Sequence, residues 1–413
     1  MLQAEDAPPG AKNHPAAPWM AVIAFINGNI VLACIYGTFS VLLSAVGVRL
    51  HVSSALSTLG IPAVNLAIAI CAPVIGVLAA RVSLRLLMLL GASLGVAGFL
   101  LLALTHSYPL YLAAYGLLIG PGMAVGVILP GTLVTRWFAV NRGKALGLVN
   151  TTIGMALMPL AINWMLHRHG LTESYLMLAG LSAVSVVVNL FVIDKPPGYN
   201  PAGAVEKGAV AGMSMAALLR LPRFWVLLFA FIASSTGSVV LGAHMVPMAR
   251  SWNLTATQGA TMLAAMSLMG IAGTLLYGWV ADRLGGMLAI AFVVLVPAVL
   301  WLLLLAHPPF IAAVLLVGLI GLNAAGILPV FSYALSEAFG RESFSRAYGV
   351  ANLINLPFSV LCVPAAAIIF ARTGSYNGAI IAVAIFLGAT GLVAFTTTRR
   401  RRPAAPVLAE SLE

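Results

Sequence analysis

Charged residues and cysteines are both scarce in this 413-residue chain. Charged side chains make up 8% of it, against about 25% in an average soluble domain, whereas hydrophobic residues make up 62%. So little charge cannot cover a water-facing surface, which excludes an ordinary soluble protein. The composition predicts instead that lipid surrounds most of the chain.

The three cysteines, Cys34, Cys71 and Cys362, lie far apart inside apolar runs. Their spacing matches no metal site or disulfide framework, and the sequence has no zinc-protease or phosphate-loop motif, so we expect no metal and no cofactor. Gly91-Ala-Ser-Leu-Gly95 fits the Gly-x-Ser-x-Gly pattern of hydrolases. That pattern needs a strand–turn–helix context, whereas this copy lies in a continuous apolar run and suits helix packing. We therefore expect that the protein is not an enzyme.

The net charge of +11 does not indicate a nucleic-acid partner. Basic residues stand singly or in pairs between apolar runs, with one cluster, Arg399 to Arg402, after the last run. Such residues orient membrane helices and attract anionic lipid. With the N-terminus inside, the basic residues in outer loops are Arg49, Arg168, Arg250 and Arg372. All the others would be cytoplasmic, which predicts a multi-pass protein of the cell (inner) membrane with both termini in the cytoplasm.

Twelve apolar runs alternate with polar breaks. Each run is longer and more continuously apolar than a strand of a membrane β-barrel, and each is long enough for a spanning helix. The predicted spans are 19–46, 56–80, 86–106, 109–135, 143–166, 172–193, 224–248, 257–281, 287–306, 309–336, 347–370 and 376–397. The sequence thus predicts an all-α membrane protein with twelve transmembrane helices.

The longest polar stretch, residues 194–223, separates two groups of six spans. We predict a cytoplasmic N-terminal tail (1–18), a six-helix bundle (19–193), a central cytoplasmic loop (194–223), a second six-helix bundle (224–397) and a cytoplasmic C-terminal tail (398–413). The N-terminal tail lacks the basic start and short apolar core of a signal peptide.

The two halves carry related motifs. Gly76-Val-Leu-Ala-Ala-Arg81 lies 202 residues before Gly278-Trp-Val-Ala-Asp-Arg283, and the same offset relates Lys144-Ala-Leu-Gly-Leu-Val-Asn150 to Arg346-Ala-Tyr-Gly-Val-Ala-Asn352. Both pairs fall at corresponding inner loops. Internal repeats are typical of secondary transporters, whose substrate site lies between the repeats near mid-membrane.

These features resemble the major facilitator superfamily, whose loop motif is roughly Gly-x-Leu-Ala-Asp-Arg-x-Gly. Gly278-Trp-Val-Ala-Asp-Arg-Leu-Gly285 is similar to it, whereas the first-half copy has Ala80 in place of the Asp and Ser83 in place of the second Gly. The resemblance covers residues 19–397. It implies two six-helix pseudo-repeats that work by alternating access.

A narrower resemblance is to the monocarboxylate-porter and oxalate–formate-exchanger branch, through Arg136-Trp-Phe-Ala-Val-Asn-Arg-Gly-Lys-Ala-Leu-Gly147 and His244-Met-Val-Pro247. It implies transport of a small organic anion, often with a proton. Many members carry an Arg after a Gly in span eight, but here Thr274 follows Gly273, and no span has a charged residue near its centre. Either neutral donors and helix N-termini hold the anion, or the substrate is uncharged.

Neutral polar side chains within the spans are therefore the candidate substrate ligands. An amide can both donate and accept hydrogen bonds, although such residues also join packed membrane helices. The candidates are Asn27, Asn29, Tyr36, Asn150, Thr151, His244, Thr274, Asn323, Asn352 and Asn355. His244 is also a candidate proton relay at the outer gate, because histidine titrates in the physiological range. Its alternative interpretation is a histidine at the membrane surface.

The family resemblance also implies a cytoplasmic gate around the loop motif. Its candidate residues are Arg81, Asp282, Arg283, Glu337, Arg341 and Arg346. We expect Asp282 to lie against the positive N-terminus of span eleven and Arg283 to pair with Glu337. Because Ala80 replaces the Asp in the first half, that half should contribute less to the gate.

Together these observations predict a secondary active transporter for a small organic solute, a monocarboxylate or related acid moved with protons. With no nucleotide-binding segment, a gradient of solute or protons must drive it. We expect a monomer whose partners are its substrate, protons and the lipid bilayer. A neutral or drug-like solute is the alternative substrate. A solute sensor built on the same frame is a third hypothesis, although the loops offer no signalling appendage.

Overall fold

The computed structural model describes residues 13–197 and 213–399. Every regular element within those ranges is a helix. Twelve helical segments are long and apolar enough to cross a membrane, which confirms the predicted all-α membrane fold. Most of the predicted tails and about half of the predicted central loop lie outside the described residues.

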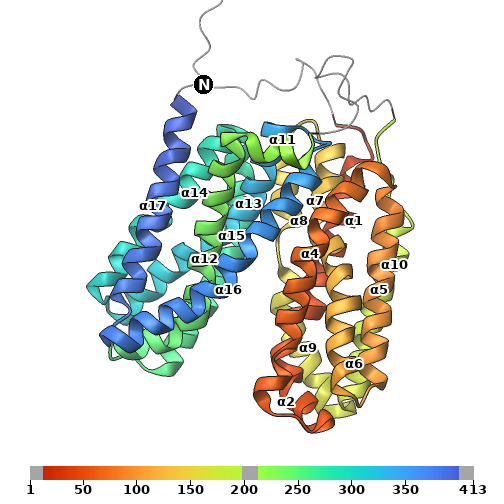
Figure 1. Ribbon diagram of the computed structural model, residues 1–413, viewed down its shortest axis with the longest axis horizontal. Helices are drawn as coiled ribbons and strands as arrows, with labels where there is room; N and C mark the ends of the chain where they lie inside the picture. The colour runs from red at the N-terminus through yellow and green to blue at the C-terminus, as the bar shows by residue number, and fades with distance from the viewer. Residues whose placement is uncertain (1–12, 198–212, 400–413) are drawn as a thin grey trace, which may run out of the picture.

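The helices form two bundles that stand side by side (Figure 1). The first bundle consists of α1 (Ala17–Ile35), α2 (Phe39–Leu50), α3 (Ser54–Ser57), α4 (Gly60–Arg81), α5 (Leu84–Leu104), α6 (Tyr108–Ala113), a π-helix (Ala114–Ile119), α7 (Gly120–Trp137), α8 (Arg142–Val149), α9 (Ile153–His169) and α10 (Leu171–Asn189). The second consists of α11 (Met215–Arg220), α12 (Pro222–Ser251), α13 (Ala256–Leu284), α14 (Gly286–Leu303), a 3-10 turn (Leu304–Ala306), α15 (Phe310–Phe339), α16 (Phe344–Thr373) and α17 (Asn377–Arg399).

The bundles meet at one end and diverge toward the other (Figure 1). Where they meet, α4, α7 and α8 pack against α13, α15 and α16. We call this the closed end; it carries the turns 138–141 and 340–343. The opposite, open end carries α2 and the turn 374–376. Toward the open end, α9 packs on α1, α2 and α10 of its own bundle.

The contacts between the bundles follow the internal repeat. A Cβ added to Gly278 of α13 would overlap the backbone of Gly143 in α8, and one added to Gly76 of α4 would lie 2.5 Å from the carbonyl O of Ser345 in α16. These pairs differ by the same 202 positions that relate the motifs. One helical turn further on, the contacts Gly147–Thr274 and Gly349–Ala72 are related by the same offset. Glycine therefore lets the backbones of the two bundles touch, as the repeat requires.

The first span is shorter than the sequence predicts. It was expected to reach residue 46, but α1 ends at Ile35 and a turn at residues 36–38 leads into α2. The Thr38 hydroxyl donates to the carbonyl O of Cys34 at 2.6 Å, and a Cβ on Gly37 would lie 2.7 Å from the Ala33 carbonyl O. Local side-chain bonds of this kind compete with the helical pattern, and glycine tolerates the resulting turn.

The fifth span, predicted as one helix over 143–166, is divided into α8 and α9 by residues 150–152. The Asn150 amide donates to the Leu146 carbonyl O at 2.8 Å. The Thr151 hydroxyl donates to the Gly147 carbonyl O at 2.9 Å. The Leu146 carbonyl O also accepts from the Asn150 backbone N–H at 3.0 Å. The Thr151 side chain therefore supplies the partner for the Gly147 carbonyl, which lets the helix stop here without leaving that group unpaired.

Candidate substrate site and gate

Asp282 joins the bundles at the closed end. Its carboxylate accepts a hydrogen bond from the backbone N–H of Gly143 at 2.7 Å and another from that of Lys144 at 2.8 Å. Both N–H groups belong to the first turn of α8. The negative charge therefore caps the positive end of a helix in the opposite bundle.

The cap is needed because α8 has none of its own. The residue before α8, Asn141, has a left-handed backbone (φ 56°) and its side chain makes no cap bond. The expected partner of Asp282, the N-terminus of span eleven, is wrong: Asp282 caps span five. The reason is that α13, which carries Asp282, packs on α8, whereas α16 packs on α4.

Four further side-chain contacts cross between the bundles here. The Thr132 and Ser345 hydroxyls lie 2.8 Å apart, and the Arg142 guanidinium donates to the Ser336 hydroxyl at 3.2 Å. Arg341 donates to the Arg136 carbonyl O at 3.5 Å, and the Arg136 guanidinium lies 3.9 Å from the Glu342 carboxylate. Of these residues, only Arg341 is one of the predicted gate residues. Arg136 and Arg142 belong to the motif Arg136 to Gly147, which pointed to this region. No sequence pattern marked the hydroxyl residues Thr132, Ser336 and Ser345.

The expected ion pair between Arg283 and Glu337 is wrong. Glu337 accepts instead from the backbone N–H of Gly286, at the start of α14, at 2.7 Å. The Arg283 guanidinium lies over the Trp279 ring, 4.3 Å from its centroid. Gly285, with φ 78°, ends α13 in a turn that brings the N-terminus of α14 to Glu337, so the carboxylate caps that helix.

Two other predicted gate residues, Arg81 and Arg346, also lie at the closed end. Arg346 donates to the carbonyl O of Met213, which leads into α11 of the same bundle. Arg81 is exposed at the last position of α4. The Arg283 and Glu337 side chains therefore make their described contacts within the second bundle, whereas the Arg346 backbone lies against Gly76 of the first bundle.

The break in the fifth span is held by Asn29 of α1. The Asn29 amide donates to the Thr151 carbonyl O, and its oxygen accepts from the Gly154 backbone N–H, both at 2.9 Å. The Thr151 hydroxyl lies 2.9 Å from that of Thr274 in the second bundle, and both are buried. The structure thus brings Asn29, Thr151 and Thr274 together where the bundles part, beside the first turn of α9.

Polar pairs also lie further along the facing helices. Tyr36 donates to the Asn65 side-chain oxygen at 2.6 Å in the first bundle. In the second, Asn355 of α16 donates to the Ser235 hydroxyl of α12 at 3.3 Å. Asn352 donates to the carbonyl O of Tyr348, four residues earlier in α16, at 2.9 Å. All these side chains are uncharged, so they can bind a solute only through hydrogen bonds.

Two predicted ligands lie inside single bundles. The Asn27 amide donates to the Asn189 side-chain oxygen at 2.6 Å and to the Ile23 carbonyl O, which joins α1 to α10. Asn323 of α15 accepts from the Tyr277 hydroxyl of α13. Both asparagines are almost fully buried. Their contacts favour the helix-packing interpretation over substrate binding.

His244 is buried in the second bundle, near the open end, and both ring nitrogens have partners there. Its Nε2 lies 3.0 Å from the Val363 carbonyl O, and its Nδ1 lies 3.3 Å from the Tyr376 hydroxyl. A carbonyl requires Nε2 to carry a proton, so Nδ1 of the neutral ring accepts from Tyr376. Burial raises the pKa of Tyr376, which keeps the phenol protonated as that donor.

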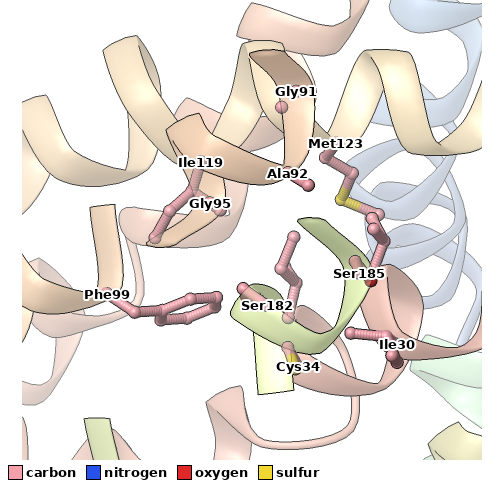
Figure 2. Close-up of a pocket in the computed structure, with 13 residues that line it drawn as sticks. Ile30, Cys34, Gly91, Ala92, Gly95, Phe99, Ile119, Met123, Ser182 and Ser185 are labelled. Atoms are coloured by element: carbon pink, nitrogen blue, oxygen red, sulfur yellow. The ribbon is translucent and has the colours of Figure 1, made fainter. Parts of the chain in front are cut away.

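The Gly91–Gly95 motif lies in the wall of a pocket inside the first bundle (Figure 2). The pocket is lined by α1, α5, α10 and the helices around Met123, and its walls include Gly91 and Gly95. A Cβ on Gly122 would lie 2.6 Å from the Gly91 carbonyl O, so the glycines allow helices to touch, as the packing interpretation expected. Ser93 points outward from the continuous helix α5. Among the described residues, no group of His, Cys, Asp and Glu side chains could hold a metal ion.

Comparisons with known proteins agree with this architecture. The family model described as Major Facilitator Superfamily matches residues 25–355 and 227–412. An uncharacterised MFS-type transporter of Bacillus subtilis, YcxA, is 27% identical over 76% of this chain and 78% of its own length. The oxalate:formate antiporter of Oxalobacter formigenes is 28% identical over 65% of this chain and 63% of its own. Monocarboxylate transporter 13 of Bos taurus is 23% identical over 76% and 74%.

Solved structures share the fold. The fucose:proton symporter FucP of E. coli superposes with a TM-score of 0.72 at 14% identity, over 91% of this chain and 98% of FucP. FucP in the outward conformation gives a TM-score of 0.67. Since the family model covers most of the sequence and the twelve helices are present, this chain belongs to the Major Facilitator Superfamily of membrane transporters.

Proposed function

We propose that this transporter carries a small monocarboxylate or related organic acid together with protons. Two relatives support this substrate class, an oxalate:formate antiporter and a monocarboxylate transporter. Transport would proceed by alternating access, because the bundles touch at one end only and every crossing contact there can break.

The closed end is cytoplasmic in this proposal. Its turns and helix ends carry Arg136, Arg142, Lys144, Arg341 and Arg346, and basic residues concentrate on the cytoplasmic side of membrane proteins. The open end then faces outward, so the structure represents the outward-facing state. In this orientation both chain termini are cytoplasmic.

One observation carries the acid assignment: the fifth span is interrupted where the bundles part. The interruption places the N-terminus of α9 inside the membrane, beside Asn29, Thr151 and Thr274. A helix N-terminus offers unpaired N–H groups and a positive dipole end, which suit a carboxylate. Transporters with discontinuous helices bind anionic groups in this way. The site can therefore bind an acid without the arginine that Thr274 replaces.

His244 is the proposed proton carrier. Protonation at Nδ1 reverses the bond to Tyr376, whose hydroxyl then accepts instead of donating, while Nε2 keeps its bond to Val363. The ring can therefore take up or release a proton without losing either partner. A neutral solute remains the second candidate, because every polar side chain at the interruption is uncharged.

The acid assignment is tested with proteoliposomes that contain a pH-sensitive dye. We expect that one or more small acids acidify the lumen of loaded vesicles beyond the level in empty vesicles. We expect the acidification of the lumen to be at least about tenfold smaller with His244→Ala, because a positioned proton-transfer group contributes at least that much to a rate. Tyr376→Phe is the matched control: it removes one partner of the ring but keeps the ring, so the signal should fall less.

Neutral solutes form the other arm of the same assay. Labelled sugars and alcohols should not enter faster than in empty vesicles. Entry of a neutral solute, with no acid moving protons, would reject the acid assignment and favour the alternative. Acid uptake that His244→Ala leaves unchanged would remove His244 from the proton pathway but keep the substrate class.

The missing acidic residue at Ala80 gives a separate prediction. By the internal repeat, Ala80 corresponds to Asp282, and the backbone of Ser345 and Arg346 corresponds to that of Gly143 and Lys144. Ala80→Asp should therefore cap the first turn of α16 across the bundles, worth about 0.3–2 kcal/mol. Over-stabilising the closed end should slow uptake, up to about 30-fold at the upper end of that range. Ala80→Asn, which lacks the charge, should slow it less; unchanged uptake in Ala80→Asp would contradict the repeat.

A further inference from the structure

Arg136, the second-to-last residue of α7, is a buried cation that uses little of its hydrogen-bonding capacity. Its side chain is 4% exposed. One guanidinium nitrogen donates to the Ala79 carbonyl O at 2.8 Å, and the buried Nε has no partner among the described residues. The nearest carboxylate oxygen, of Glu342, is 3.9 Å away, which is longer than a hydrogen bond. A buried charge is costly unless it is paired and hydrogen-bonded.

Among the described residues, the other carboxylates of the closed end are those of Asp194, Asp282 and Glu337, and the Asp194 carboxylate accepts from the Arg85 backbone N–H at 2.9 Å. Asp282 is held by the backbone of α8, and Glu337 is held by the backbone of α14. Further positive charge lies nearby, because Arg341 donates to the Arg136 carbonyl O. Among the described residues, Glu342 therefore provides the carboxylate nearest to the Arg136 guanidinium.

This proximity depends on the closed end being closed. Arg136 and Ala79 belong to the first bundle, whereas Glu342 lies in the turn between α15 and α16 of the second. When the bundles separate at this end, Glu342 moves away with the second bundle. Arg136 stays on the first bundle, on the path that opens toward the cytoplasm, with its counter-charge removed.

We propose that Arg136 is a carboxylate-binding site of the inward-facing state, whose charge Glu342 balances from 3.9 Å in the outward-facing state. The ligand is a small carboxylate anion, so that the solute and Glu342 exchange on one guanidinium; this identification of the ligand as the transported solute rests on the proposed function. The site lies at the cytoplasmic end of α7, which explains why the span centres contain no cation. A planar guanidinium suits a carboxylate particularly well, since two N–H groups can meet its two oxygens.

Removal of Glu342 from Arg136 also affects the equilibrium between the inward-facing and outward-facing states. An inward-facing carrier without solute leaves Arg136 without a counter-charge, so that state is disfavoured until a carboxylate binds. A carboxylate on the cytoplasmic side should therefore raise the inward-facing population. A carboxylate shifts the populations only through its tighter binding to the inward-facing state. The shift reaches about tenfold, at ten times the dissociation constant, where binding to the outward-facing state is negligible.

The test measures opening of the closed end directly in the purified full-length protein. Ser345→Cys places a thiol at a buried contact between the bundles, in a background with Cys34→Ala, Cys71→Ala and Cys362→Ala. Its rate of alkylation by a water-soluble maleimide reports exposure to water. The probes are sodium formate and sodium acetate, compared with sodium chloride at constant ionic strength.

We expect formate or acetate to raise the alkylation rate up to about tenfold, with little response to chloride. Arg136→Gln should abolish the response, and Arg85→Gln, which removes an exposed charge at the same end, should keep it. Glu342→Gln keeps the arginine and removes its competitor, so it should respond at lower acid concentration. If Arg136→Gln fails to fold, the acid concentration at which Glu342→Gln responds still tests whether Glu342 competes with the acid.

Three results would overturn the proposal: an equal response to chloride, a response that survives in Arg136→Gln, or no response in either the reporter protein or Glu342→Gln. The proposed function is tested separately by the dye assay. A carboxylate response through Arg136 without any acid transport would keep this site and reject the transport proposal. Acid transport without a carboxylate response would keep the transport proposal and reject the carboxylate site at Arg136.

Discussion

Gly278→Ala is expected to abolish transport while the protein stays folded. A Cβ at this position would overlap the Gly143 carbonyl O and lie 3.0 Å from the Gly147 Cα. All these atoms belong to the opposite bundle, so the strain arises only when the closed end is closed. Backbone atoms cannot move aside as a flexible side chain could, and overpacking typically costs about 1–3 kcal/mol. Since each 1.4 kcal/mol is tenfold in population, the outward-facing state should fall by roughly 10- to 100-fold.

The Ser345→Cys reporter checks this expectation. Alkylation should be fast in Gly278→Ala without any solute, and uptake from outside should be lost. Gly242→Ala is the matched control, because it also replaces a helical glycine of the second bundle but would meet no atom within 4 Å. Normal uptake by Gly278→Ala would show that the bundles do not approach at this point during transport.

Asp282→Asn should have the second-largest effect, because it weakens both bonds that cap α8 from the opposite bundle. The asparagine oxygen can still accept one N–H, but its NH2 group would face the other donor. Hydrogen bonds to a charged group contribute about 1.5–3 kcal/mol, so losing one should shift the equilibrium toward the inward-facing state by roughly tenfold or more. We expect faster alkylation of the reporter and slower uptake.

Glu337→Gln separates gating from general helix capping. Glu337 makes the same kind of bond as Asp282, a carboxylate accepting from the first turn of a helix, but its partner Gly286 is in its own bundle. This variant should reduce thermal stability slightly and leave the alkylation rate near that of the reporter protein. If both variants opened the closed end equally, the Asp282 bonds would not be specific to the contact between the bundles.

The twelve spans and the internal repeat were predictable from local sequence. A run of about twenty apolar residues has one stable arrangement in lipid, a helix that pairs its own backbone groups. The motif Gly278 to Gly285 and its degraded copy at Gly76 predicted equivalent loops, and the structure confirms that these glycines meet the opposite bundle at equivalent points. Which polar side chains bind solute was not predictable from local sequence, since an asparagine within a span looks the same whether it joins two helices or faces a solute.

The sequence by itself therefore determined the solvent, the number of helices, the repeat and the superfamily, because each depends on composition and on short motifs. The tertiary structure decided which helix Asp282 caps, that Glu337 caps α14 rather than pairing with Arg283, and that Arg136 meets Glu342. It also showed that Asn27 and Asn323 join helices within a bundle, and that Asn29 and Thr151 hold an interrupted span. The physical reason is that these roles depend on which N–H, carbonyl or charge from a distant helix comes within hydrogen-bond distance, and helix packing alone sets that distance.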